Sequence, residues 1–178
     1  MEGHKIILND FLNLVKGENA ITNILDAGSG RTSLSIIVNT FPYTAIDAVV
    51  YPGDQRKISS IKEIAEGNKN INLIEKDICG ELIVKEYDII IAHLLLGEAA
   101  KFGNTFEDLL EKVVAMKYKY LIIIDYLEDP AVNEKSIVDI CEKHNLNIIY
   151  KSYVTNEKPQ VWEDFVGTHN FGYLIKRL

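Results

Sequence analysis

A short segment rich in glycine and polar residues is the part of the sequence most suited to chemistry. It contains Asp26, Gly28, Gly30 and Thr32 at alternate positions and directly follows an apolar run. Glycines between a strand and a helix permit a tight turn and let a ligand approach the backbone, at the edge where open α/β sheets bind ligands. The Asp26 carboxylate would repel a pyrophosphate and attract an ammonium or sulfonium group. Two glycines alone are equally typical of a plain turn.

Two further carboxylates fall where a bound nucleoside would need them. Asp47 comes 17 residues after Gly30 and is expected to end the second strand, where an acidic residue accepts hydrogen bonds from ribose hydroxyls. Asp77 follows the third strand, where a polar group could meet an adenine amine. Each could equally be an ordinary carboxylate at a strand end. A dinucleotide fingerprint needs glycine or alanine at Ser33, which, with the position of Asp26, counts against nicotinamide binding.

Residues that follow the fourth and fifth predicted strands point at the same edge. His93 is the candidate catalytic base, because a histidine with an ordinary pKa near 6.5 can take a proton at neutral pH. It could equally be a packing residue or lie beside a cofactor. Trp162 lies in a predicted loop at residues 155–170, and loops of that length are often lids or binding segments. The candidates on the substrate side are Glu98, Asp125, Tyr126 and Trp162.

The elements that position these residues alternate between short apolar runs and helical patterns, as in an α/β fold around a parallel sheet. A short first helix is expected at about residues 9–17. Five strands are predicted at residues 21–26, 43–47, 70–75, 87–92 and 120–125. Residues 146–154 and 171–177 are strand-like and are expected to pair antiparallel. The predicted fold is a doubly wound, mostly parallel, seven-stranded Rossmann-like sheet with a C-terminal antiparallel hairpin, in three α/β/α layers.

Composition and length limit the class of protein. The 178 residues argue for a single domain over residues 1–178. The net charge of −7 disfavours a nucleic-acid-binding face. No apolar run approaches the roughly 18–20 residues of a membrane span, and no secretory signal is visible. Cys79 and Cys141 are not spaced like zinc ligands, so no metal site is expected. We expect a soluble, cytoplasmic protein that does not bind membranes.

Together these motifs resemble those of the class I S-adenosylmethionine-dependent methyltransferases. Residues 26–32 look like the family's first motif, with Thr32 in place of a frequent third glycine. Asp47 matches its ribose-binding acid and Asp77 its adenine-side residue, while residues 87–93 resemble its fourth motif, whose strand end faces the transferring methyl group. The resemblance implies S-adenosylmethionine as cofactor. The implied cofactor-binding residues are Asp26, Gly28, Gly30, Thr32, Asp47, Asp77 and His93.

The resemblance implies a methyltransferase that acts on a small-molecule or protein acceptor. Members that methylate nucleobase amines usually carry an Asn/Asp-Pro-Pro-Tyr/Phe motif after the fourth strand. Ala-His-Leu-Leu-Leu stands there instead, so nucleic acid is an unlikely partner. Two alternatives stay open: a non-catalytic binding or assembly module that retains the fold, and an NAD(P)-dependent oxidoreductase. A homodimer or a partner chain could complete the site, because the chain has no separate substrate-recognition insertion.

Overall fold

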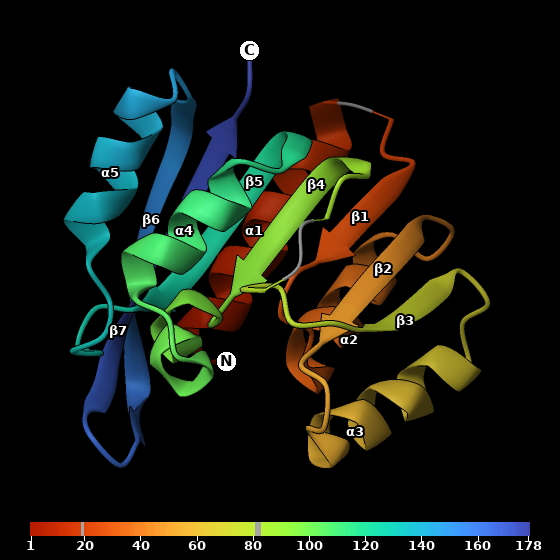
Figure 1. Ribbon diagram of the computed structural model, residues 1–178, viewed down its shortest axis with the longest axis horizontal. Helices are drawn as coiled ribbons and strands as arrows, with labels where there is room; N and C mark the ends of the chain where they lie inside the picture. The colour runs from red at the N-terminus through yellow and green to blue at the C-terminus, as the bar shows by residue number, and fades with distance from the viewer. Residues whose placement is uncertain (19, 81–82) are drawn as a thin grey trace.

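One sheet organises the chain. The computed structural model describes residues 1–18, 20–80 and 83–178, and within them seven strands pair in the order β3-β2-β1-β4-β5-β7-β6 (Figure 1). The strands are β1 (Asn23–Asp26), β2 (Ala45–Val50), β3 (Ile71–Glu75), β4 (Glu86–His93), β5 (Lys117–Tyr126), β6 (Asn147–Val161) and β7 (Val166–Lys176). β1 to β5 are parallel, whereas β7 runs antiparallel between β5 and β6. The predicted doubly wound sheet with a terminal hairpin is confirmed.

Helices cover both faces of this sheet (Figure 1). One face packs against α1 (Gly3–Glu18), α2 (Arg31–Thr40) and α3 (Gln55–Glu66). The other face packs against the 3₁₀ helix η1 (Leu96–Phe102), α4 (Phe106–Val114) and α5 (Glu134–Lys143). Central strands must then be apolar on both sides. In β4, Ile89 and Ile91 belong to the core under α1, α2 and α3, whereas Ile90 and Ala92 belong to the core under η1, α4 and α5. The predicted three-layer arrangement is confirmed.

The first helix begins earlier than its sequence pattern indicates, at Gly3 rather than near residue 9. The first N–H groups of a helix have no partner within the helix itself. Here the N–H of Gly3 donates to Asn156 Oδ1 at 2.6 Å, and the N–H of His4 donates to Asn170 Oδ1 at 3.1 Å. Asn156 and Asn170 belong to the terminal hairpin, so no local signal could reveal this cap. The prediction of a short first helix at residues 9–17 is wrong at its start.

The terminal hairpin is longer than predicted, and the predicted loop at residues 155–170 is wrong. β6 continues to Val161 and β7 begins at Val166, so four residues connect them. The pairing resumes beyond a register shift between Thr155 and Gln160. Most side chains of this extension are exposed on both faces and show no apolar alternation. None of the helices in the described ranges is long and apolar enough to cross a membrane.

Close packing of α1 on β7 yields a stability prediction. A Cβ at Gly172 would lie 2.4 Å from Ile7 Cγ2 and 3.0 Å from Phe11 Cε2, so Gly172→Ala must separate the helix from the strand. We expect it to lower the free energy of unfolding by about 1–3 kcal/mol in urea titrations. Gly17→Ala is the control, because a Cβ there meets nothing within 4 Å and alanine favours a helix by about 0.5–1 kcal/mol. Equal stability of the two variants would contradict this packing.

Candidate active site

The glycine loop joins β1 to α2 at the carboxyl edge of the sheet. The Ala27 N–H donates to the Ile91 carbonyl at 2.9 Å, and the Ser29 N–H donates to the Val49 carbonyl at 2.7 Å. The loop is therefore tied to the strands on both sides of β1, where the chain order reverses and open α/β sheets form their ligand crevice. A Cβ built on Gly30 would meet nothing within 4 Å, so open space lies beside this end of the loop.

Asp26 is fully buried beneath the loop and holds it together. Its Oδ2 accepts hydrogen bonds from Ser29 Oγ at 2.8 Å and from Ser33 Oγ at 2.7 Å. Its Oδ1 has no hydrogen-bond partner among the described residues. Burial raises the pKa of this carboxyl to about 6, although the two serine hydroxyls and the Lys57 charge act in the opposite direction. The sequence placed Asp26 facing a ligand, but the side chain is fully buried and borders none of the three hollows around the site.

The hollow in front of Gly28 is nearly closed. It has a volume of about 30 Å³ and is bordered by the ends of β2 and β3, including Asp77. A Cβ on Gly28 would lie 2.5 Å from Leu95 Cδ1, so this leucine fills the space that the glycine leaves. The rings of Tyr51 and Phe102, which also border the hollow, stack with their centroids 4.4 Å apart. The structure therefore brings Gly28 and Asp77 to one small hollow that the chain's own side chains occupy.

A second hollow of about 210 Å³ lies on the other side of the glycine loop. Five predicted site residues line it together: Gly28, Gly30, Thr32, His93 and Glu98. His4, at the start of α1, lines it as well, and the sequence analysis missed this residue. A signal was present, because buried His4, Ile7, Phe11 and Val15 recur at helical spacing and extend the apolar face back to residue 4.

The third hollow brings together the four candidates on the substrate side. Glu98, Asp125, Tyr126 and Trp162 all line a cavity of about 140 Å³, with Phe165 beside them. The ring centroids of Tyr126 and Trp162 are 5.9 Å apart, and Phe165 lies 5.7 Å from Tyr126 and 6.1 Å from Trp162. Three aromatic rings thus form one wall, and carboxylates form another. Glu98 borders all three hollows and connects them.

Asp125 is the most deeply buried carboxyl of this cavity, with 3% of its surface exposed. Its oxygens accept hydrogen bonds from the N–H groups of Gly97 and Tyr126, each at 3.0 Å. Burial raises its pKa to about 7, against these two hydrogen bonds, and the nearby carboxylates of Asp129 and Glu98 raise it further. Burial also raises the pKa of Asp129. A positively charged group in the cavity would relieve this repulsion and favour the ionised carboxylates.

Asp47 does not lie where the sequence placed it. β2 continues three residues beyond it to Val50, so the prediction that Asp47 ends the second strand is wrong. Its carboxylate accepts hydrogen bonds from Tyr87 Oη at 2.7 Å, Lys85 Nζ at 3.0 Å and Asn72 Nδ2 at 3.3 Å. Burial alone would raise the pKa of Asp47, but these hydrogen bonds outweigh it and hold the pKa below its usual value. Asp47 lines none of the three hollows.

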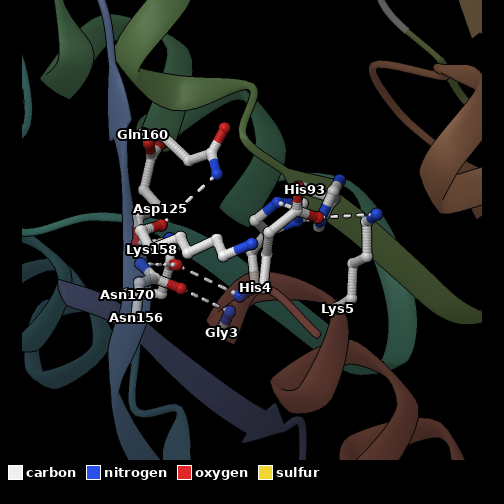
Figure 2. Close-up of polar contacts among 10 residues, drawn as sticks. Gly3, His4, Lys5, His93, Asp125, Asn156, Lys158, Gln160 and Asn170 are labelled. Atoms are coloured by element: carbon white, nitrogen blue, oxygen red, sulfur yellow. Dashed lines mark hydrogen bonds and ion pairs between the residues drawn. The ribbon is translucent and has the colours of Figure 1, made fainter. Parts of the chain in front are cut away.

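His93, the last residue of β4, forms a buried pair with His4 (Figure 2). His93 Nε2 lies 2.9 Å from His4 Nδ1, and the ring centroids are 4.9 Å apart. Burial lowers the pKa of His93 to about 3 and that of His4 to about 4. Both rings are therefore neutral near pH 7, which leaves imidazole lone pairs rather than positive charges at the strand end.

A strained residue follows His93 and shapes two of the hollows. Leu94 has a φ of +52°, a left-handed conformation that is uncommon for residues with a side chain. Its N–H donates to the Ile124 carbonyl at 2.9 Å, which holds the turn against β5. The chain then places Leu95 against Gly28 and the Gly97 N–H on Asp125. Strain of this kind persists where the surroundings determine the conformation, and it is frequent at functional sites.

No family model matches the sequence, and no curated protein matches it. Solved structures do match. The N-methyltransferase NodS from Bradyrhizobium japonicum WM9, with S-adenosyl-L-homocysteine, gives a TM-score of 0.72 at 13% identity, over 97% of this chain and 86% of its own. The 1,6-didemethyltoxoflavin-N1-methyltransferase from Burkholderia thailandensis gives 0.69 at 13% identity, over 99% of this chain and 79% of its own. The chain has the fold of the class I methyltransferases.

The likeness extends to larger enzymes of that fold. The mitomycin 7-O-methyltransferase MmcR gives a TM-score of 0.59 at 15% identity, over 97% of this chain. The chain spans 54% of the length of MmcR, about half of that protein. At these identities the comparisons establish the methyltransferase fold, and the cofactor and the acceptor have to be argued from the site itself.

The buried Asp26 of this methyltransferase fold gives a pH prediction. Folding holds its proton up to about pH 6, whereas an unfolded carboxyl releases it near 3.8, so stability is lost as the pH rises between these values. Asn at this position does not titrate. We expect the free energy of unfolding of Asp26→Asn, relative to the native protein, to rise by about 2 kcal/mol between pH 4 and pH 7.

Urea titrations at several pH values measure this difference. Asp139→Asn changes an exposed carboxyl on α5 and serves as the control, with an expected change below about 0.5 kcal/mol over the same range. A pH-independent difference for Asp26→Asn would show that the buried carboxyl keeps its ordinary pKa.

Proposed function

We propose that the protein is a methyltransferase that uses S-adenosylmethionine and acts on a small, partly apolar acceptor with an amine or other basic group. The observation that carries the proposal is that Gly28, Gly30, Thr32 and His93 line one hollow at the carboxyl edge of the sheet. When bound there, S-adenosylmethionine would supply a methyl group on a positively charged sulfur. The methyltransferase fold supports this function, and the residues that line the hollows support it further.

The residues present fit such a cofactor in chemistry. The open space beside Gly30 would accommodate its amino-acid end, and the unpartnered Oδ1 of Asp26, buried beneath the loop, would reach that end only after the loop shifts. Asp77 would meet the adenine, because its Oδ1 accepts only the Cys79 N–H at 2.9 Å among the described residues and leaves Oδ2 available. Apolar side chains, among them Ile78, border the same hollow and suit the faces of a planar base.

Two features require a change from the present arrangement. A cavity of about 30 Å³ is far below the roughly 300–1,000 Å³ of ligand pockets, so Leu95 and Phe102 would have to move aside for an adenosine. β2 ends at Val50 and Tyr51 follows it, and neither residue offers a carboxylate to a ribose. The ribose contact of the family is therefore not assigned to Asp47, whose three hydrogen bonds hold it elsewhere.

The acceptor would occupy the cavity between Tyr126, Trp162 and Phe165, next to the end of β4. Aromatic walls favour planar or cationic groups, and a cation over an aromatic face is stabilised further when it is desolvated. On the other wall, the carboxyl of Asp125 favours an ammonium or a basic amine, whereas Glu98 already pairs with Lys57 at 3.3 Å and with Lys101 at 3.5 Å. An acceptor with an aromatic ring and a basic nitrogen satisfies both walls.

A non-catalytic binding module is the second candidate. The closed hollow in front of Gly28 and the absence of a carboxylate at residues 50 and 51 favour it, because both weaken the expected cofactor contacts. The two candidates differ in a measurable way: the enzyme transfers a labelled methyl group to an acceptor, and the module does not.

Calorimetric titration with S-adenosylmethionine and with its demethylated product tests the cofactor assignment. We expect Asp77→Asn to weaken binding about tenfold, because a hydrogen bond to a charged group is lost. Asp47→Asn is the matched control, and its affinity should stay within about twofold of the native value, since Asp47 lines no hollow. Absence of binding of both compounds at millimolar concentration would overturn the proposal, and equal weakening by the two variants would restore the ribose role of Asp47.

Methyl transfer from isotopically labelled S-adenosylmethionine into the small-molecule fraction of a cell extract, followed by mass spectrometry, tests the acceptor cavity. Trp162→Ala removes one aromatic wall, so we expect about a tenfold loss of the labelled product with unchanged cofactor affinity. Tyr43→Ala removes a ring that is 96% exposed and remote from the cavity, and should leave the product unchanged. Labelled product that does not depend on Trp162 would place the acceptor elsewhere.

A further inference from the structure

Two of the four histidines in the chain share a hydrogen bond inside the site. His93 Nε2 and His4 Nδ1 are 2.9 Å apart, and both residues are buried (Figure 2). A neutral imidazole carries one N–H and one lone pair, so in this pair one ring donates and the other accepts. Which ring donates decides whether His93 has a lone pair left for chemistry.

The charge of Glu2 favours one direction of this hydrogen bond. Its Oε2 lies 3.6 Å from His4 Nε2 and 2.6 Å from Lys5 Nζ. The hydrogen bond from Lys5 lowers the pKa of the Glu2 carboxyl below its usual value, so the group is ionised near pH 7. An ionised carboxylate favours an N–H over a lone pair on the facing nitrogen. The Glu2 charge thus favours the tautomer in which His4 carries its hydrogen on Nε2 and its Nδ1 accepts from His93 Nε2–H.

The backbone of α1 fixes this geometry. The His4 N–H donates to Asn170 Oδ1 at 3.1 Å, while Asn170 Nδ2 donates to the Asp125 carbonyl at 3.2 Å (Figure 2). His4 is thus tied to the strand end that forms the acceptor cavity. The His4 ring also meets the Tyr126 ring edge-on, with centroids 6.1 Å apart. The pair cannot rearrange without disturbing the wall of that cavity.

We propose that His4 is a positioning residue that holds His93 in the Nε2–H tautomer, so that His93 Nδ1 stays unprotonated and takes the proton of the methyl acceptor. The inference rests on the proposed methyl transfer. Among the described residues, no group forms a hydrogen bond to His93 Nδ1. His93 lines the hollow beside the glycine loop and not the aromatic cavity, but the two hollows share Leu94 and Glu98, so the reacting atom of the acceptor would extend from the cavity into the hollow of His93. His4 would act through His93 and need not touch the acceptor itself.

The proton and electron balance of the step is simple. The acceptor's lone pair forms the bond to the methyl carbon, and the sulfur keeps the electron pair of the bond that breaks. The proton that the acceptor loses goes to His93 Nδ1. His93 can then pass its Nε2 hydrogen to His4 Nδ1, which moves the positive charge next to the Glu2 carboxylate. No oxidant, reductant or further reactant is needed.

This second transfer explains why a pair serves better than one histidine. Burial makes the imidazolium form of His93 unfavourable, and the charges of His4 and Lys5 act in the same direction. The charge of Glu2 favours the imidazolium form of His4, against burial and Lys5. Glu2 is the group that offsets the cost of the positive charge, and it lies beside His4. His93 alone would be neutral but a weak base.

Two-dimensional ¹H–¹⁵N spectra of the histidine rings test the inference in the protein without cofactor. The chain has four histidines, and His144 and His169 pair with Glu111 and Glu128 outside the site, so the spectrum is simple to assign. At pH 7 we expect both His4 and His93 to carry their hydrogen on Nε2. A hydrogen on His93 Nδ1 overturns the inference, whatever the activity of the protein.

Two substitutions at residue 4 separate positioning from packing. In His4→Asn, the Asn Oδ1 can still accept from His93 Nε2–H, so we expect the His93 tautomer to persist and methyl transfer to stay within about threefold. In His4→Leu the acceptor is lost, so we expect mixed His93 tautomers and a loss of about 10–100-fold in kcat with little change in KM. Equal losses in both variants, with an unchanged His93 tautomer, would show that His4 only packs.

Failure of the proposed function gives a different result from failure of this inference. Calorimetry that shows no binding of S-adenosylmethionine overturns the function, because the cofactor titration does not depend on the His93 tautomer. The tautomer measurement overturns the inference without any cofactor present. If His4→Leu fails to fold, His4→Asn and the spectrum of the native protein still decide, because both keep a hydrogen-bond acceptor at residue 4.

Discussion

Two asparagine side chains on the terminal hairpin hold the first turn of α1, and the site depends on this contact. Gly3 and His4 donate their N–H groups to Asn156 and Asn170, which satisfies donors that a helix start leaves without partners. Because Asn170 also binds the Asp125 carbonyl, the same contact fixes the strand end beneath the acceptor cavity. The hairpin, which carries none of the glycine-loop chemistry, thereby places His4 against His93 and closes this edge of the sheet.

The sheet could be predicted because its central strands are buried on both faces, which produces continuous apolar runs such as residues 89–92. The hairpin extension could not, because residues 155–161 are mostly exposed and show no alternation. The early start of α1 was visible only in part: its apolar face extends back to His4, but the groups that cap Gly3 and His4 lie more than 150 residues away. Local patterns report burial within an element, whereas a cap from a distant hairpin leaves no local trace.

The candidate site shows the same division. Residues directly after strands, such as Glu98, Asp125 and Tyr126, could be placed at one edge because parallel strands bring their carboxyl ends together. Asp47 was misplaced because a fixed distance from the glycine loop says nothing about where β2 ends. Lys85 and Tyr87, about 40 residues further along the chain, donate hydrogen bonds to the Asp47 carboxylate and hold it within the sheet. The sequence could not show these contacts, because they form only when β2 and β4 lie in one sheet.

Burial raises the pKa of the acids at this edge and lowers the pKa of its histidine bases, which is relevant to the proposed cationic methyl donor. It raises the pKa of Asp26 to about 6 and of Asp125 to about 7, and lowers that of His93 to about 3, so the neutral form of each is favoured. A positive charge at this edge would favour the ionised forms of Asp26 and Asp125 and would be stabilised by them in return. The same charge would disfavour an imidazolium, so His93 would keep its lone pair while the donor is bound. The buried carboxyls that lower stability near pH 7 would therefore gain from the positive charge of the proposed cofactor.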